Sequence, residues 1–218
     1  MSVPRRFLGV GPSLLCRAAI MTAFGLSGAA AEAPCPLCAA ADLQAAVPQA
    51  SRRSAYALDA SWETDAGALL KLGSLRGRPA VVALFFTTCH VACPITVETL
   101  SEVDRDLPAA SSVPILLVTI DPQTDTVSEL AQCRAEHALS GRFTLVRGAL
   151  ADTQALADAT GIAYRREASR LVHMPKIVVL DRAGNVAASF PGLRVNPRDV
   201  ARAAASLEAA RSQVASAP

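Results

Sequence analysis

Residues 81–100 read VVALFFTTCHVACPITVETL, and this stretch decides the fold. An apolar run, residues 80–86, leads into two threonines and then into Cys89 and Cys93. A continuous apolar run of this length is typical of a strand covered on both faces of a sheet. Residues 94–107 read as a helix whose leading proline suits the first turn. We therefore expect both cysteines where a buried strand passes into a helix.

The rest of the chain continues this alternation of strands and helices. A hairpin is expected first, on either side of the turn at residues 65–67, with Trp62 as its large apolar residue. Further along we expect strands at 113–120 and 142–148, helices at 124–139, 151–161 and from Asn196 onward, and a hairpin at 176–190. This order predicts an α/β fold in which helices flank a central mixed sheet, preceded by an N-terminal hairpin.

Length and composition favour one packed domain after an N-terminal extension. The chain has 218 residues, of which 51% are apolar and 18% charged, enough to build a single core from Ala, Val and Leu. Only Lys71 and Lys176 of the 21 basic residues are lysines, and the arginines are spread along the chain. That spread argues against a nucleic-acid partner.

The first 31 residues have the pattern of a secretory signal peptide. Arg5, Arg6 and Arg17 supply the positive segment, a short apolar stretch follows, and Ala29–Ala31 matches a small-residue cleavage site. We expect a periplasmic protein. An uncleaved membrane anchor is the alternative, although the apolar stretch is shorter than the roughly 20 residues of a membrane span. Removing residues 1–31 takes away three arginines and no acid, which changes the net charge from +2 to −1.

Residues 32–54 are rich in Ala, Pro and Ser and predict a flexible arm before a folded domain at residues 55–213. The arm contains Cys35 and Cys38, which could form a local disulfide, pick up a metal ion or have no essential role. Export permits disulfides. Five cysteines would remain in the mature chain, and this odd number argues against a fully paired framework.

The spacing of Cys89 and Cys93 places both on one face at the start of a helix, so their sulfurs can meet at one metal ion or bond to each other. The positive end of the helix favours thiolate over thiol, and both uses need a thiolate. The structural alternatives are a buried stabilising disulfide between the two, or two small core residues. A zinc finger is disfavoured because no second Cys or His pair has the required spacing.

Three segments in this order, FFTTCHVACP, VTIDPQTDT and LVHMPKIVVLD, resemble the Sco/SenC family. The resemblance covers about residues 56–211. It implies a thioredoxin-like fold and a role in assembling the binuclear copper centre of cytochrome c oxidase. The implied partner is the copper-site subunit of the oxidase, with other periplasmic copper carriers or thiol reductants as further partners. Membrane contact would come only through that partner or an uncleaved leader.

The resemblance places copper ligands at Cys89, Cys93 and His173, with one copper ion for each domain. Two soft thiolates suit Cu(I), and an added imidazole also supports Cu(II). Two positions depart from the family pattern. His90 follows the first cysteine, where proline is frequent, and Val172 precedes the histidine, where aspartate is common. The missing carboxylate would remove a neighbour that tunes metal affinity.

Several further residues are weaker candidates. His90 could add a ligand, but we expect its side chain to point away from the sulfurs. Cys133 and His137 lie four residues apart on an expected helix, which a metal pair would require, although a buried Cys and a surface His explain them as well. Asp121 follows the second buried strand, and we expect it to shape the loop near the site rather than to bind metal.

A second class of function uses the same cysteines without a metal. Pro175 lies directly before the strand at residue 176, as a proline does in thioredoxin-like oxidoreductases. In that reading Cys89 and Cys93 form the redox pair of a thiol-disulfide oxidoreductase. The sequence favours an exported copper chaperone. It leaves open whether the protein also reduces cysteines of its target and whether it turns over as an enzyme.

Overall fold

The computed structural model describes residues 53–167 and 170–214, together with the side chains up to residue 210. The expected leader at residues 1–31, and the arm up to residue 52, lie outside the described residues. So do Cys35 and Cys38. Among the described helices, none is both long and apolar enough to cross a membrane.

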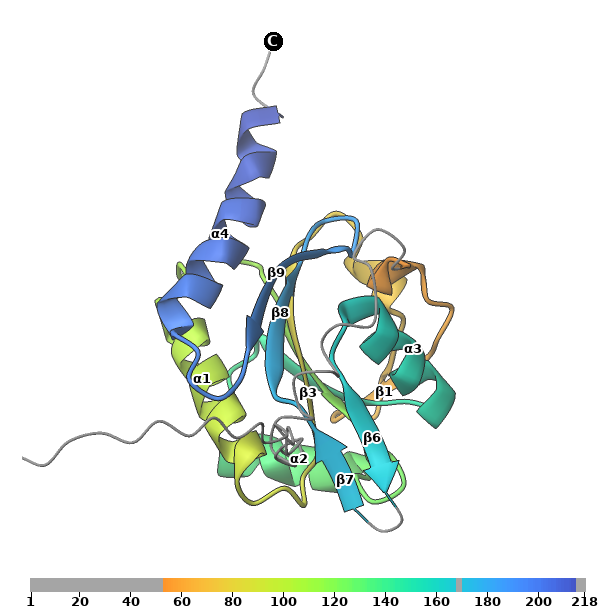
Figure 1. Cartoon of the computed structure of the whole chain (residues 1–218). Helices are drawn as coiled ribbons and strands as arrows, with labels where there is room; N and C mark the ends of the chain where they lie inside the picture. Colours follow the sequence, from red (N-terminus) through yellow and green to blue (C-terminus); the bar gives the residue numbers. More distant parts are fainter. Residues whose placement is uncertain (1–52, 168–169, 215–218) are drawn as a thin grey trace, which may run out of the picture. The chain divides into compact units, whose positions relative to one another are not determined.

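In the described part of the chain, a mixed sheet of seven strands forms the centre of the domain, in the order β2-β1-β5-β4-β3-β8-β9 (Figure 1). Strands β3, β4 and β5 are parallel to one another, and the remaining pairs are antiparallel. The strands are β1 (Trp62–Thr64), β2 (Leu69–Leu70), β3 (Ala80–Phe85), β4 (Ile115–Thr119), β5 (Phe143–Arg147), β8 (Lys176–Leu180) and β9 (Val186–Pro191). The expected mixed sheet with an N-terminal hairpin is confirmed.

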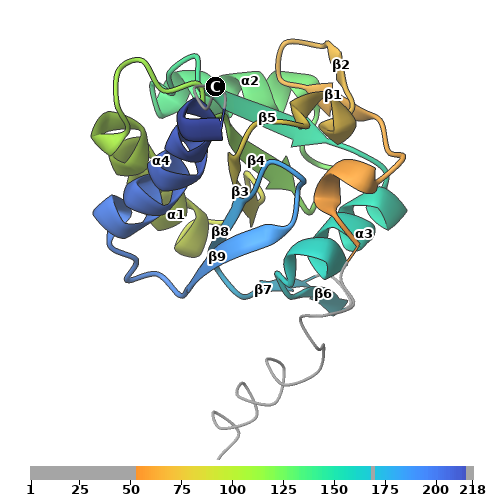
Figure 2. The same cartoon turned by 90° about the horizontal axis from the view of Figure 1, so that it is seen from above.

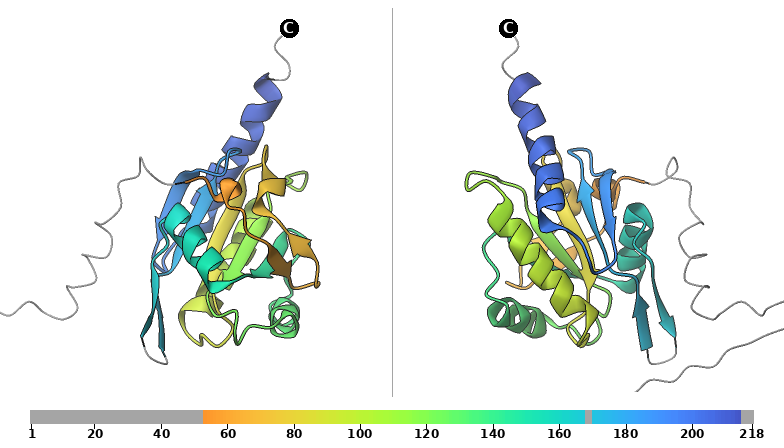
Figure 3. Two further views of the ribbon diagram at one scale, coloured as in Figure 1. Left: turned by 90° about the vertical axis from the view of Figure 1, so that its right-hand side faces the viewer. Right: turned by 60° about the vertical axis from the view of Figure 1, so that its left-hand side comes forward.

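Helices cover both faces of this sheet, as Figures 2 and 3 show. On one face lie α1 (Ala92–Asp106), α2 (Val127–Glu136) and α4 (Pro197–Val214). On the other lie α3 (Leu150–Thr160) and two short 3-10 turns, η4 (Ala55–Ala57) and η5 (Leu72–Leu75). The fold is therefore a three-layer α/β sandwich with two hydrophobic cores.

Strand β3 explains why the opening stretch of sequence is apolar throughout. All six of its residues are buried. Val81, Ala83 and Phe85 face the core under α1 and α4, whereas the residues between them face the core under α3. A parallel strand covered on both faces has no polar side to show. Its C-terminal end therefore has a fixed position, from which the Cys89 loop begins.

The predicted helix boundaries follow from local chemistry that the structure confirms. The Thr126 hydroxyl accepts a hydrogen bond from the Glu129 amide at 3.2 Å and caps α2. The Asn196 side chain likewise accepts from the Arg198 amide at 3.1 Å at the start of α4. Gly161 ends α3 with a φ of 65°, a conformation that glycine adopts without strain.

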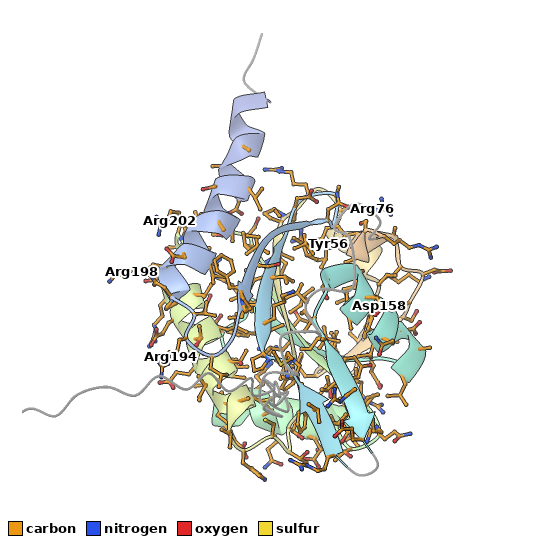
Figure 4. All side chains as sticks on the ribbon, viewed as in Figure 1. Tyr56, Arg76, Asp158, Arg194, Arg198 and Arg202 are labelled. Carbon is orange, nitrogen blue, oxygen red and sulfur yellow. The ribbon has the colours of Figure 1, made fainter. Side chains whose placement is uncertain are left out.

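The β8–β9 turn packs tightly against Tyr56, which is labelled in Figure 4. Gly184 has a φ of +85°, and a Cβ atom there would lie 2.5 Å from Cγ of Tyr56. The Tyr56 hydroxyl donates to the carbonyl of Arg78 at 3.0 Å. Glycine is thus required at this turn for both its backbone conformation and its lack of a side chain.

A second, two-stranded sheet was not expected from the sequence. It consists of β6 (Tyr164–Glu167) and β7 (Arg170–His173), which pair in antiparallel fashion. Figures 1 and 3 show this hairpin projecting from the end of the domain at which α1 begins. His173 is the last residue of β7 and pairs with Tyr164. The predicted distal ligand therefore lies at the base of a projecting hairpin.

Candidate functional site: a dithiol and a histidine hairpin

The loop between β3 and α1, residues 86–91, holds Cys89 against the start of the helix and is called the dithiol loop. The Cys89 amide donates to the carbonyl of Phe86 at 3.3 Å and closes a tight turn. Val91 occupies the N-cap position and offers no side-chain acceptor. Instead, the Cys89 sulfur accepts a hydrogen bond from the Cys93 amide at 3.4 Å. The first cysteine therefore caps the helix that carries the second.

These contacts lower the pKa of the Cys89 thiol. Partial burial alone would raise this pKa, but hydrogen bonds from the Cys93, Val91 and Ala92 amides and from the Cys93 thiol outweigh it. Amide groups at a helix N-terminus stabilise negative charge on a nearby sulfur. Cys89 is thus the cysteine of the pair that more readily forms a thiolate.

The second cysteine has the opposite character. Cys93 is buried with an exposed fraction of 4%, and burial raises its pKa to about 12, with smaller contributions in the same direction from Cys89 and from the charge of Asp125. The pair therefore joins an accessible, activated thiol to a protected one. This asymmetry suits an attacking and a resolving thiol.

His173 offers an imidazole that makes no hydrogen bond. Within the described structure, both of its ring nitrogens are shielded from solvent and neither has a hydrogen-bond partner. Burial lowers its pKa to about 4, so the ring is neutral at pH 7. A neutral imidazole whose nitrogens are not hydrogen-bonded has a nitrogen lone pair that can coordinate a metal ion.

The structure brings Cys89 and Cys93 together but does not gather His173 with them. In residues 53–167 and 170–214, no three His, Cys, Asp or Glu side chains are arranged so that they could hold a metal ion. The hairpin and the start of α1 do project from the same end of the domain (Figure 3). The three-ligand set stays a prediction.

Sequence reasoning missed Asp125 as a site residue. Its carboxylate is completely buried and accepts hydrogen bonds from the Thr87 amide, the Thr87 hydroxyl and the Thr119 hydroxyl. Thr87 lies only two residues before Cys89. The sequence does show an aspartate directly before Thr126. Because Thr126 already accounted for the start of the helix as its cap, the aspartate was given no role.

Asp121 shapes the neighbouring loop, as the sequence predicts. Its backbone carbonyl accepts from the Thr124 and Asp125 amides at 3.0 and 2.9 Å. Its side chain also accepts from Arg166 at 2.7 Å. Because Arg166 belongs to β6, this ion pair connects the loop after β4 to the histidine hairpin.

The remaining candidates, Cys133, His137 and His90, differ in how far they are buried. Cys133 is a free, buried thiol in α2 whose pKa burial raises to about 11. His137 ends the same helix and is exposed, as is His90 beside the dithiol. The structure therefore supports the interpretation of Cys133 as a core residue and His137 as a surface residue.

Comparisons with solved structures find the same fold in Sco proteins. ScoI from Bradyrhizobium japonicum, solved with copper bound, is 20% identical with a TM-score of 0.58, covering 69% of this chain and 96% of that one. BsSco, a Sco family cytochrome c oxidase assembly protein with a disulfide switch, is 18% identical with a TM-score of 0.64, covering 73% and 95%. A SCO1/SenC family lipoprotein from Bacillus anthracis is 19% identical with a TM-score of 0.60, covering 69% and 94%.

The family comparison agrees with the order of motifs along the chain. No match was found among curated proteins. The SCO1/SenC family profile matches residues 51–208, well over half of the chain, and spans the dithiol loop, the loop after β4 and the histidine hairpin. On this match, and with the thioredoxin-like sandwich that its structural neighbours share, the chain belongs to the SCO1/SenC family.

Proposed function

We propose that the protein is an exported copper chaperone that binds one copper ion through Cys89, Cys93 and His173. It delivers the ion to the copper-site subunit of cytochrome c oxidase. The observation that carries this proposal is a pair of thiols, one of them activated, together with a neutral imidazole whose nitrogens have no hydrogen-bond partner among the described residues. The start of α1 and the hairpin that ends at His173 lie at one end of the domain (Figure 3). Copper is the cargo in this function and leaves with each delivery.

The donor set fits copper in both oxidation states. Two thiolates suit soft Cu(I), and the imidazole of His173 extends the set to Cu(II). The copper-bound ScoI relative supports this assignment. Because His173 lies on the hairpin rather than in the central sheet, the third ligand can join or leave the ion while the sulfurs of Cys89 and Cys93 keep their places at the start of α1. Such a site can hold copper and still release it.

A second function, thiol-disulfide exchange, is favoured by the unequal cysteines. The Cys89 thiolate attacks one sulfur of a target disulfide and releases the other as a thiolate. Cys93 then attacks the Cys89 sulfur, freeing the second target thiol and leaving a Cys89–Cys93 disulfide, which an external dithiol must reduce. The low pKa of Cys89 and the burial of Cys93 support this order of attack. Such a step would prepare the cysteines of the oxidase subunit for copper.

His173→Ala separates the two functions because only copper transfer needs the imidazole. We expect this variant to keep most exchange with an oxidised peptide of the oxidase subunit and to lose more affinity for Cu(II) than for Cu(I), which two thiolates can hold by themselves. It should fail to support oxidase assembly in cells. His137→Ala, which removes an exposed histidine from α2, is the matched control and should behave as wild type. Assembly of a fully copper-loaded oxidase with His173→Ala would replace the chaperone function with the oxidoreductase function.

Export to the periplasm is the part of the proposal that rests on the leader, residues 1–31. The lipoprotein relative from Bacillus anthracis supports a membrane-facing location. Cell fractionation and the intact mass of the purified protein test it: a periplasmic protein that starts near Glu32 is expected. A full-length mass in the cytosolic fraction would contradict export.

A further inference from the structure

The buried carboxylate of Asp125 joins the ends of two central strands. Thr87 follows β3, and Thr119 is the last residue of β4, where it pairs with Phe85 in the sheet. One carboxylate accepts from both threonine hydroxyls and from the Thr87 amide, at 3.2 Å to its nearer oxygen. The end of β4 and the residues that follow β3 are thus held together at the edge where the dithiol loop begins.

Stability alone does not explain this arrangement. Moving an ionised carboxylate out of water is costly unless it is fully hydrogen-bonded, and apolar side chains of similar size often serve a core better. The three groups that bond to Asp125 are uncharged donors. An acceptor with no hydrogen of its own can hold all of them at once. We therefore expect the Asp125 carboxylate to fix the positions of Thr87 and Thr119 rather than to add to the free energy of unfolding.

The position that it fixes is that of Cys89. Thr87 is followed by Thr88 and then by Cys89, whose amide closes the turn to Phe86. If Thr87 were free to rotate, that turn would relax, and the Cys89 sulfur would leave the Cys93 amide.

We propose that Asp125 is a positioning residue for the dithiol: through Thr87 it holds Cys89 at the start of α1, in reach of Cys93. This rests on the proposed function only in taking these two cysteines as the reactive pair. The experiment below uses neither copper nor the oxidase. Its failure is therefore distinct from a failure of the chaperone function.

The test is the equilibrium between the Cys89–Cys93 dithiol and its disulfide. The full-length protein is equilibrated at pH 7 with glutathione disulfide, which takes up two electrons and two protons from the dithiol and becomes two glutathione molecules. Trapping the thiols and analysing peptides by mass spectrometry reports this pair separately from the other cysteines. Asp125→Ala should lower the oxidation constant about tenfold, the scale of one lost hydrogen bond to a charged group.

Asp65→Ala is the matched control. Asp65 is another buried carboxylate, and it accepts from Arg134 and from the Leu145 amide, away from the dithiol loop. Its loss should lower the melting temperature yet leave the oxidation constant of the pair within about twofold. Equal oxidation constants in the Asp125→Ala and Asp65→Ala proteins would overturn the proposal, because Asp125 would then be structural only.

Two further variants complete the test. Asp125→Asn keeps one acceptor oxygen, and the Thr119 hydroxyl can turn to accept from the new amide, so the oxidation constant should recover to within about threefold of wild type. Thr87→Val removes one donor and keeps the shape of the side chain. It should lower the constant about threefold and carries the test if Asp125→Ala does not fold. A wild-type value in Thr87→Val would then overturn the proposal.

Discussion

The dithiol loop and the β6–β7 hairpin each carry part of the proposed copper site, but they are held in different ways. The loop follows a strand that is buried on both faces, and Asp125 holds Thr87, the second residue of the loop. The hairpin forms a separate sheet whose residues are partly or fully exposed. Its connections to the rest of the domain include the Arg166–Asp121 ion pair and the contact of Leu171 with the core under α3.

This difference suggests that, in the proposed site, the two cysteines are permanent ligands and His173 is an exchangeable one. In the proposed site, the loop thiol of Cys89 and the helix thiol of Cys93 keep their spacing whether or not a metal is present, because the Cys93 amide bonds to the Cys89 sulfur. A histidine at the base of a weakly held hairpin can join and leave without disturbing the core. Regions with few buried contacts open at low free-energy cost. A carrier that must release its cargo benefits from having one ligand in such a region.

The largest change in the free energy of unfolding should come from shortening one apolar side chain in α1 and, for comparison, one in the β6–β7 hairpin. Leu100 on α1 is completely buried, and Leu100→Ala should lower the free energy of unfolding by about 2–5 kcal/mol. Leu171 on the hairpin is half-buried against the other core, and Leu171→Ala should cost about 1 kcal/mol. Urea unfolding measures both. Equal losses would show that the hairpin is as firmly packed as the helix.

A smaller effect is expected from alkaline pH, which acts on the core that holds the dithiol helix. Burial raises the pKa of Cys133 from 9.0 to about 11, so between these values the unfolded chain loses a proton that the folded chain keeps. Stability contributed by the neutral thiol is therefore complete below pH 9 and is lost as pH rises toward 11. Urea unfolding under reducing conditions should show a steeper fall across this window for wild type than for Cys133→Ala. If the free energy of unfolding fell equally with pH in both proteins, Cys133 would not have a raised pKa in the folded state.

Much of the fold could be predicted because its signals are local. The apolar run at residues 80–86 allows little other than a doubly covered strand, and the caps at Thr126 and Asn196 depend on atoms within three residues. Pro94 and Gly161 mark a helix start and a helix end for similar reasons. The order of strands and helices then limited the architecture to an α/β sandwich.

The parts that were missed depend on distant contacts. The hairpin at residues 164–173 contains several arginines and little apolar alternation, so its strands have no sequence period to detect. The role of Asp125 depends on Thr87, 38 residues earlier in the chain. The resemblance assigned His173 as a ligand, yet only the structure shows that it lies on a hairpin and that its nitrogens have no hydrogen-bond partner in the part of the chain that the structure describes.

The smallest expected effect on stability gives the sharpest test of the comparison. Arg166→Ala removes the ion pair to Asp121, in which the arginine side chain is 39% exposed. An ion pair this close to solvent contributes less than about 1 kcal/mol to the free energy of unfolding. Amide hydrogen exchange should nevertheless quicken across the described parts of the hairpin, residues 164–167 and 170–173, while the amides of α1 and β3 keep their protection.

Arg165→Ala is the control for this last variant because Arg165 pairs with Glu167 in the same strand, at 2.6 Å, and does not reach the sheet. It should leave hairpin exchange close to wild type. If both variants quicken exchange equally, the ion pair to Asp121 does not anchor the hairpin. If Arg166→Ala instead lowers global stability by several kcal/mol, the hairpin is part of the cooperative core, and the division between a rigid dithiol and an exchangeable histidine fails.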